Sequence, residues 1–231
     1  MAARPGGVAR AKMVSFSAVK SPDLQITLSE RTGFYAKEED ARLSITQPAL
    51  IKNRSAMGEI IMYHYVGNSP FGWIRITSSG DAVTALRFLG DDATPVNDGD
   101  DVSRETWQQI EAWSEGERIG FDIPLRPDVS PALDRWLNVL AGVPYGVTVT
   151  YGELARRGGM PDAPRAAGSA CARNPVPLII PCHRVTRHDG SLGNFGGIEG
   201  FHIKDPRNLA LKQALIDHEA RYVSRFRNSL L

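Results

Sequence analysis

Residues 150–185 read TYGELARRGGMPDAPRAAGSACARNPVPLIIPCHRV, and this stretch decides how the C-terminal half of the chain folds. Thr150 precedes a short helical pattern, and Glu153 follows three residues later at the spacing of a capping box. Gly158-Gly159 ends this helix, and a second helix is expected over 165–173. Two short helices joined by a Gly- and Pro-rich turn predict a helix-turn-helix, whose second helix commonly enters a DNA groove.

The second of these helices carries small side chains at positions 166–170. Small side chains would let the helix backbone lie close to DNA. They would equally well allow two helices to pack tightly in a protein core. The residues alone leave both interpretations open.

The run Pro181-Cys182-His183-Arg184-Val185 is the strongest sign of chemistry. A cysteine attacks as its thiolate, and a neighbouring His and Arg can lower the pKa of the thiol. Prolines at 177 and 181 would hold the sulfur in one place. A lone Cys-His pair is weak evidence, because buried cysteines are usually inert. Its position between a helix-turn-helix and the glycine-rich turn at 190–197 favours a nucleophile.

The net charge of +1 conceals an uneven distribution of charge along the chain. Residues 1–56 carry a net +4, residues 57–130 a net −8 and residues 131–231 a net +5. A basic half beside an acidic one is expected when one face of a protein meets phosphate, although an arginine-rich solvated surface would look the same. The basic residues nearest the cysteine are Arg156, Arg157, Arg165, Arg173, Arg184 and Arg187.

Composition excludes several classes of protein. The chain has 231 residues, 42% hydrophobic and 23% charged, as in an ordinary globular protein. No apolar run approaches the roughly 18 residues of a membrane-spanning helix. The two cysteines, Cys171 and Cys182, rule out a disulfide scaffold and lack the spacing of a structural zinc site. The first 20 residues lack the apolar core of a secretory signal.

The N-terminal half predicts an antiparallel meander followed by a helix. Strands are expected at 60–66, 72–77 and 82–88, separated by turn residues, and the acidic stretch 90–101 is expected to be a loop. Ser103 is the expected cap of a helix over 104–114. One more strand is expected at 119–125. Residues 1–56 precede this pattern and are expected to form a poorly ordered extension.

After residue 130 the pattern becomes helical. Ser130 or Asp128 can cap a segment whose apolar residues lie on one face and which ends at Gly142. Near the C-terminus, Asp205-Pro206 is the expected start of another helix, with Asp as the cap and Pro in the first turn.

These motifs together resemble the active-site signature of the 6-O-alkylguanine-DNA alkyltransferases, also called methylated-DNA–protein-cysteine methyltransferases. The resemblance covers residues 57 to about 220 and is strongest from 130 onwards. It is carried by Val143-Pro144-Tyr145-Gly146, Thr150 to Ala155, Arg165 to Gly168, Asn174 to Val185, Gly193 to Gly197, and Lys212 to Glu219.

The resemblance implies a stoichiometric transferase that moves a methyl or other alkyl group from oxygen-6 of guanine in DNA irreversibly onto its own Cys182. His183 matches the residue that deprotonates the thiol through water. Glu219 matches the carboxylate that orients this histidine, in the logic of a nucleophile, a base and an orienting group. Asn174 matches a residue that supports the turn. No diffusible cofactor and no metal are implied.

The resemblance also implies how damaged DNA is held. Tyr151 matches a phenol that donates to a guanine ring nitrogen, and Phe195, Val185 and Gly196 match the wall of the base pocket. The target base must be flipped out of the duplex, and Arg165 matches the side chain that fills the vacated space. The remaining DNA-binding positions, in the minor groove and along the phosphates, are Ala166, Ala167, Gly168, Ser169 and Arg173, with the other basic residues as phosphate contacts.

Two departures from the family pattern concern the pocket. Phe195 stands where the family commonly has tyrosine, so a ring remains but a hydroxyl is lost. The segment 197–212 is longer than expected, with an insertion at 198–205. The N-terminal zinc ligands of some members are absent, and Cys171 and His202 do not form such a set.

The sequence thus predicts an α/β protein with a small ribonuclease-H-like N-terminal domain at 57–129 and a helical C-terminal domain with a winged helix-turn-helix at 130–225. The expected partner is double-stranded DNA with an alkylated guanine, bound by a monomer away from any membrane. The expected location is the cytoplasm of a bacterium or the nucleus of a eukaryote. Three alternatives remain: a lesion-binding protein without activity, which the presence of Cys182 opposes, a cysteine-dependent hydrolase or transferase on small molecules, and a transcription factor.

Overall fold

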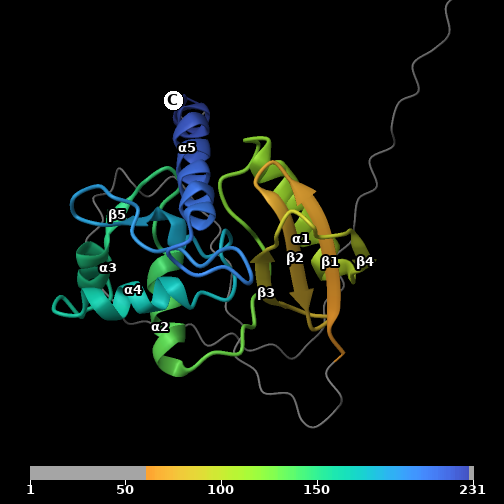
Figure 1. The fold of residues 1–231 in the computed structure, drawn as a ribbon, viewed down its shortest axis with the longest axis horizontal. Coiled ribbons are helices and arrows are strands. Elements are labelled where there is room, and N and C mark those ends of the chain that lie inside the picture. Colours follow the sequence, from red (N-terminus) through yellow and green to blue (C-terminus); the bar gives the residue numbers. More distant parts are fainter. Residues whose placement is uncertain (1–60, 229–231) are drawn as a thin grey trace, which may run out of the picture. The chain divides into compact units, whose positions relative to one another are not determined.

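The computed structural model describes residues 61–228, all of which belong to one compact unit. The expected N-terminal extension, residues 1–56, and the expected start of the first strand at residue 60 lie outside the described residues. The expected domain boundary at 129/130 falls inside the compact unit, between the part of the chain that forms the sheet with one helix and the part that forms the remaining helices (Figure 1). The division into two domains stays a prediction.

The sheet has four antiparallel strands in the order β3-β2-β1-β4. β1 (Tyr63–Ser69), β2 (Gly72–Ser78) and β3 (Val83–Phe88) confirm the expected meander, with the first strand shifted towards the C-terminus. β4 (Val96–Asp98) lies within the segment that the sequence predicts to be a loop. It pairs with β1 from Val66–Val96 to His64–Asp98, a long-range contact that the local acidic composition conceals.

Helix α1 (Asp101–Ser114) contacts β1 and β2 through its apolar face, which carries Trp107, Ile110 and Trp113. The predicted face is confirmed, but the predicted cap is wrong. The cap is Asp100, whose side chain accepts from the backbone N–H of Ser103 at 2.9 Å. Both residue types cap helices, so residue preference alone did not separate them.

The strand expected at 119–125 is wrong. Only Leu125 forms a bridge there, parallel to Val83 in β3. Val83 donates to the carbonyl of Pro124 and accepts from the N–H of Arg126. Pro124 lacks an N–H of its own, which limits how far such a ladder can extend.

The remaining chain builds the helical part of the fold. Its first helix, α2 (Pro131–Ala141), is capped by Ser130, one of the two caps that the sequence allows, and its C-cap is Gly142, as predicted. Thr150 caps α3 (Tyr151–Arg157) by accepting from Glu153 N, which confirms that cap as well. The other elements are β5 (Val149–Thr150), α4 (Pro164–Ala172), the short 3-10 helix η2 (Cys182–Arg184), β6 (Val185–Thr186) and α5 (Pro206–Asn228).

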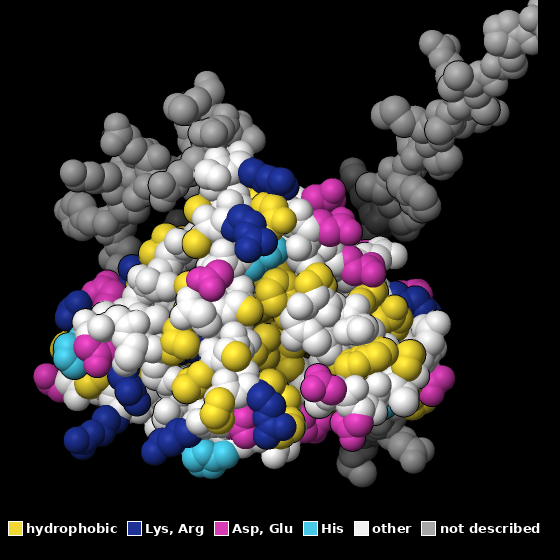
Figure 2. Space-filling model, turned by 45° about the horizontal axis from the view of Figure 1, so that its top comes forward, with side chains coloured by type: hydrophobic (Ala, Val, Ile, Leu, Met, Phe, Trp, Pro, Cys, Tyr) yellow, Lys and Arg dark blue, Asp and Glu magenta, His cyan; other side chains and the backbone are white. Residues whose placement is uncertain are grey.

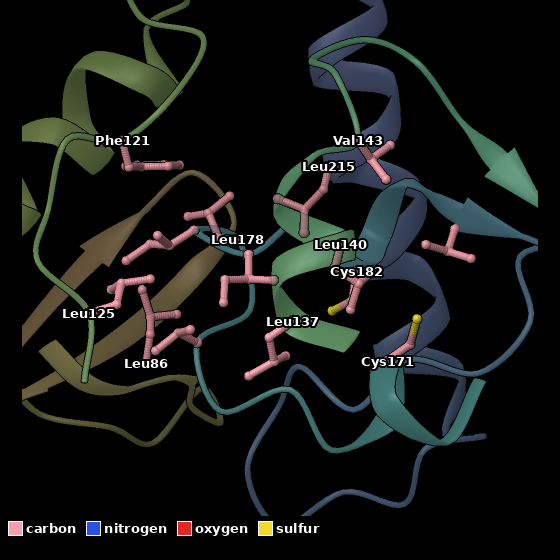
Figure 3. Packing of buried hydrophobic residues seen from close by; sticks show 14 of the residues in the cluster. Leu86, Phe121, Leu125, Leu137, Leu140, Val143, Cys171, Leu178, Cys182 and Leu215 are labelled. Carbon is pink, nitrogen blue, oxygen red and sulfur yellow. The ribbon is translucent and has the colours of Figure 1, made fainter. Parts of the chain in front are cut away.

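The sheet and the helices share one apolar core. In Figure 3, Leu178 lies between Leu86 and Leu125 on the sheet side and Leu137 and Leu215 on the helical side. Leu178 is 1% exposed. The segment that leads to Cys182 therefore passes through the junction of the two halves, and the core fixes where the cysteine lies. Among the described helices, none is long and apolar enough to cross a membrane.

Candidate active site

The loop before the cysteine is closed by one side chain, Asn174. Its amide nitrogen donates to the carbonyl of Ile180 at 2.7 Å, and its amide oxygen accepts from Val176 N at 3.0 Å. Within this loop Leu178 has a φ of 76°, a left-handed conformation that a leucine keeps only where its surroundings hold it. Asn174, which was predicted to support this turn, lies where it can do so.

Cys182 begins helix η2 and is 2% exposed. Burial raises the pKa of its thiol, while a hydrogen bond from the Asn174 side chain and the charge of Lys212 act in the opposite direction. The resting group is therefore the neutral thiol, and a base must take its proton before the sulfur can attack.

His183, the next residue, is completely buried and placed for this task. Its Nε2 lies 2.8 Å from Oε1 of Glu219 in α5. A carboxylate partner favours the tautomer with the proton on Nε2. Nδ1 makes no hydrogen bond within the described part of the chain, so its lone pair is free to accept a proton. Burial lowers the pKa of His183, which keeps it neutral before reaction.

Glu219 is held by three further donors. Arg184 Nε and Nη2 donate to its carboxylate at 2.8–3.1 Å, and Gly146 N donates at 3.0 Å. Although burial opposes ionisation, the charges and hydrogen bonds of His183 and Arg184 hold the pKa of Glu219 at about 2. The orienting carboxylate is thus ionised at any physiological pH.

Arg184 corrects one prediction and adds a residue to the site. The sequence places it among the arginines that contact phosphate, but Arg184 is 6% exposed and pairs with Glu219. The sequence holds one indication of this burial: Arg184 lies within the apolar run 176–185. Such a run is expected to be buried, and a charged residue inside it is then buried too and needs a partner of opposite charge.

Tyr151, at the start of α3, lies half-buried against the glycine-rich turn. Burial raises the pKa of its phenol, so the hydroxyl stays protonated and able to donate. Gly193 packs against it so closely that a Cβ there would stand 2.6 Å from the phenol oxygen. The φ of +68° at Gly193 is a second reason why the position requires glycine.

Lys212 in α5 is a buried cation that sequence reasoning matched but gave no role. Its Nζ donates to the carbonyls of Val185 at 2.6 Å and Leu192 and lies 5.9 Å from the centre of the Tyr151 ring. Burial lowers its pKa to about 8. Lys212 thereby ties β6 and the glycine-rich turn to the last helix.

The three residues expected to wall the base pocket come from two segments. Val185 and Phe195 are buried, and Gly196 is partly exposed. Phe195 N donates to the carbonyl of Ile203 at 3.2 Å, so the inserted segment 198–205 is bonded to the main chain of this pocket residue. Asn208 anchors the same segment by accepting from Ile198 N at 2.9 Å.

Helix α4 packs against α3 and presents one exposed face, formed by Arg165, Ala166, Ser169 and Arg173. Ala167 was predicted to contact DNA, and this is wrong for the structure described, because it is completely buried. Positions 165, 169 and 173 recur at helical spacing on the outer face, whereas 167, 170 and 171 face the core. Gly168 lies against the Tyr151 ring.

Charge on this surface follows the division seen in the sequence. On the face in Figure 2, Asp and Glu predominate on the side of the sheet, and Lys and Arg project from the side of α3 and α4. In α3, Arg156 and Arg157 both pair with Glu153, at 2.5 and 3.0 Å. The cations of the exposed α4 face are Arg165 and Arg173.

Comparison with known proteins agrees with this geometry. Residues 132–221 match the family model described as the 6-O-methylguanine DNA methyltransferase DNA binding domain. A methylated-DNA–protein-cysteine methyltransferase of Methanosarcina acetivorans is 36% identical over 149 residues, which is 62% of this chain and 94% of that protein. One of Mycobacterium tuberculosis is 34% identical, over 59% of this chain and 86% of that protein.

Solved structures give the same result. The O6-methylguanine methyltransferase of Mycobacterium tuberculosis has a TM-score of 0.60 at 29% identity, covering 70% of this chain and 94% of that chain. A structure of the same organism's protein in complex with DNA has a TM-score of 0.58 at 31% identity, covering 69% and 93%. By sequence, by fold and by the placement of Cys182, His183 and Glu219, this chain belongs to the methylated-DNA–protein-cysteine methyltransferase family.

Proposed function

We propose that this protein repairs DNA by direct reversal, moving an alkyl group from oxygen-6 of guanine onto Sγ of Cys182, once per molecule. The observation that carries the proposal is the buried pair of His183 and Glu219 beside a buried cysteine. Membership of the family supplies the substrate, and no diffusible cofactor takes part. The fold that goes with this function is a ribonuclease-H-like sheet domain and a winged helix-turn-helix.

The chemistry follows from the three side chains. The proton of the Cys182 thiol passes to Nδ1 of His183 through water, and Glu219 stabilises the imidazolium that forms. A sulfur lone pair forms the new S–C bond as the bond from the alkyl carbon to oxygen-6 breaks. The electron pair of that bond leaves with guanine, whose ring nitrogen receives a hydrogen bond from the Tyr151 hydroxyl. The thioether product does not return to thiol, so the reaction is stoichiometric.

DNA is held by the exposed face of α4 in the minor groove, where base identity is poorly displayed and any sequence can be searched. Arg165, exposed at the start of this helix, enters the stack after the damaged nucleotide has been flipped out. Arg173 contacts phosphate from the other end of the helix. The protein acts as a monomer in the compartment that holds the DNA, the cytoplasm in a bacterium or archaeon.

Mass spectrometry after incubation with duplex DNA containing O6-methylguanine tests the proposal. Trypsin cleaves after Arg165, Arg173 and Arg184, so Cys171 and Cys182 fall in different peptides, 166–173 and 174–184. The peptide 174–184 is expected to gain the mass of one CH2, in proportion to the methylated base lost from the DNA.

Controls separate the alternatives. Cys182→Ala is expected to lose transfer and keep binding to alkylated DNA, whereas Cys171→Ala keeps both, because Cys171 lies in α4 without a base. A hydrolase would release the methyl group and leave both peptides unmodified over many turnovers. A binding protein without activity would leave the DNA methylated. Either result, or a gain of mass on peptide 166–173, would refute the proposal.

A further inference from the structure

The edge strand of the sheet, β3, contacts the loop that carries Cys182. One arginine of this strand, Arg87, makes side-chain hydrogen bonds to that loop. Arg87 donates through Nη1 to the carbonyl of Pro175 at 2.6 Å and to that of Asn174 at 3.3 Å. The preceding residue of the strand, Leu86, donates its N–H to the same Pro175 carbonyl at 2.9 Å. Strand β3 therefore hydrogen-bonds the start of the loop through both its main chain and a side chain.

One residue, Asn174, links these hydrogen bonds to the loop that carries the nucleophile. Asn174, whose carbonyl Arg87 contacts, spans the loop from Val176 to Ile180 with its side chain, and the same side chain acts to lower the pKa of the Cys182 thiol. Hydrogen bonds thus run from the sheet through Asn174 into the loop that carries the sulfur. Because Leu178 in the same loop holds a left-handed conformation, the loop keeps its shape only under restraint from its surroundings.

The same strand also holds the segment that follows Phe195. Phe88 donates its N–H to Gly197 at 3.1 Å and accepts from Glu199 N at 2.8 Å. On the neighbouring strand Arg75, the register partner of Arg87, forms an ion pair with Glu199 at 2.6 Å. The two arginines therefore contact different segments: Arg75 contacts the inserted segment, and Arg87 contacts the loop that carries Cys182.

We propose that Arg87 is a positioning residue for the transfer reaction, acting through the carbonyls of Asn174 and Pro175 to hold the loop that carries Cys182. This inference rests on the proposed function. It gives the sheet half of the molecule a part in positioning the nucleophile. A guanidinium suits the task because it stays charged when partly buried, and its Nη1 alone carries two N–H donors within reach of both carbonyls.

Burial supports this assignment. Arg87 is partly buried and its pKa is lowered first of all by desolvation, so the fold places a cation where water is scarce. Its charge is also felt at Cys182, since each group appears in the electrostatic environment of the other. Loss of Arg87 would leave the loop carbonyls with fewer donors and would widen the range of positions that the sulfur visits.

The test compares full-length variants in single-turnover transfer, with free O6-benzylguanine and with methylated duplex DNA as substrates. Arg87→Ala is expected to slow both reactions about tenfold and by equal factors, because small misplacements of a reacting atom cost one to two orders of magnitude. Arg87→Lys is expected to restore part of the rate, and Arg87→Gln less. Arg75→Ala, the matched control on the same face of the sheet, keeps the rate of the unaltered protein.

Rates are measured at a temperature where circular dichroism shows every variant folded, so that a loss of stability alone does not lower them. If the folded Arg87 variants transfer at the unaltered rate, or if only the DNA reaction slows, the positioning role is refuted. If Arg87→Ala does not fold, Arg87→Lys and Arg87→Gln decide in the same way. Failure of the unaltered protein to transfer would instead refute the proposed function.

Discussion

Arg184 and Glu219 form a buried, doubly bonded ion pair, with Arg184 Nε 2.9 Å from one carboxylate oxygen and Nη2 2.8 Å from the other. Glu219 is 2% exposed and Arg184 6%. A carboxylate that orients a histidine must itself be oriented, and the guanidinium fork supplies that second constraint. Arg184 also donates to the carbonyl of Val143, which ties the pair to the turn before β5.

The first prediction concerns the stability of this pair. Arg184→Met leaves an uncompensated buried carboxylate and is expected to lower the free energy of unfolding by about 3–5 kcal/mol. The double variant Arg184→Met with Glu219→Gln is expected to recover part of that loss, because no unpaired charge remains. Chemical denaturation at neutral pH measures both. A single variant within about 1 kcal/mol of the unaltered protein would contradict the prediction.

A second prediction concerns acid. The pKa of Glu219 is about 2 in the folded protein, against an ordinary value of 4.5. Because the folded value is depressed, the stabilisation is complete above pH 4.5 and disappears as the pH falls towards 2, by about 3 kcal/mol in total.

Denaturation curves for the unaltered protein and Glu219→Gln, taken across this range, isolate the contribution. Exposed carboxylates with lowered pKa values, such as Asp81 and Glu153, are present in both proteins and cancel in the difference. The difference in stability is expected to shrink below pH 4.5. A constant difference down to pH 2 would show that Glu219 is not the group responsible.

A third prediction concerns Lys212, whose pKa falls from 10.5 to about 8. Because the pKa of Lys212 is lower in the folded state than in the unfolded state, the folded state binds fewer protons between pH 8 and 10.5. This group therefore adds stability as the pH rises through that window. Below pH 8 both states are protonated and the contribution is constant. Relative to Lys212→Met, the unaltered protein is therefore expected to gain stability from pH 8 upwards.

The comparison with Lys212→Met is essential, because other groups act in the opposite direction. Burial raises the pKa of Cys171, Cys182, Tyr145 and Tyr151, and each of these costs stability as the pH rises. The two tyrosines act alike in both proteins. The two cysteines lose the charge of Lys212 in the variant, which raises their pKa further and acts in the same direction as the expected difference. A difference that stays flat between pH 8 and 10 would mean that the buried ammonium titrates normally.

Local signals in the sequence predicted local structure well. Ser130 and Thr150 cap their helices because the capping bond joins a side chain to a backbone N–H three residues later, within the same short stretch. Asp100 was missed for the same reason, since Ser103 offers an equally good local pattern. β4 was missed because its only support is pairing with β1, some 30 residues away in a segment rich in turn residues.

For the site as well, neighbouring residues were predictable from the sequence and contacts between distant residues were not. Cys182 and His183 are adjacent and carry a recognisable motif, but the 36-residue separation of His183 and Glu219 was bridged only by family resemblance. The part played by Arg184 required burial to be known, since the residue type alone indicates an exposed charge. Arg87 has no sequence signature at all, because its partners are backbone carbonyls that any residues would provide.

The last prediction separates base flipping from chemistry and rests on Arg165, exposed at the start of α4. Flipping costs a few kcal/mol in a duplex and nothing for a free base. If Arg165 fills the space left in the stack, Arg165→Ala is expected to slow transfer from methylated duplex DNA by about tenfold or more, and to leave transfer from free O6-benzylguanine unchanged. Arg165→Lys is expected to rescue only part of the duplex rate, because an ammonium lacks the planar donor fork.

Arg173→Ala, at the other end of the same exposed face, is the matched control. Loss of one phosphate contact weakens binding to all DNA and reduces the slope of the salt dependence by about one, without singling out the damaged duplex. Equal losses on the duplex and on the free base would place Arg165 in the active site itself and end its assignment to the DNA stack.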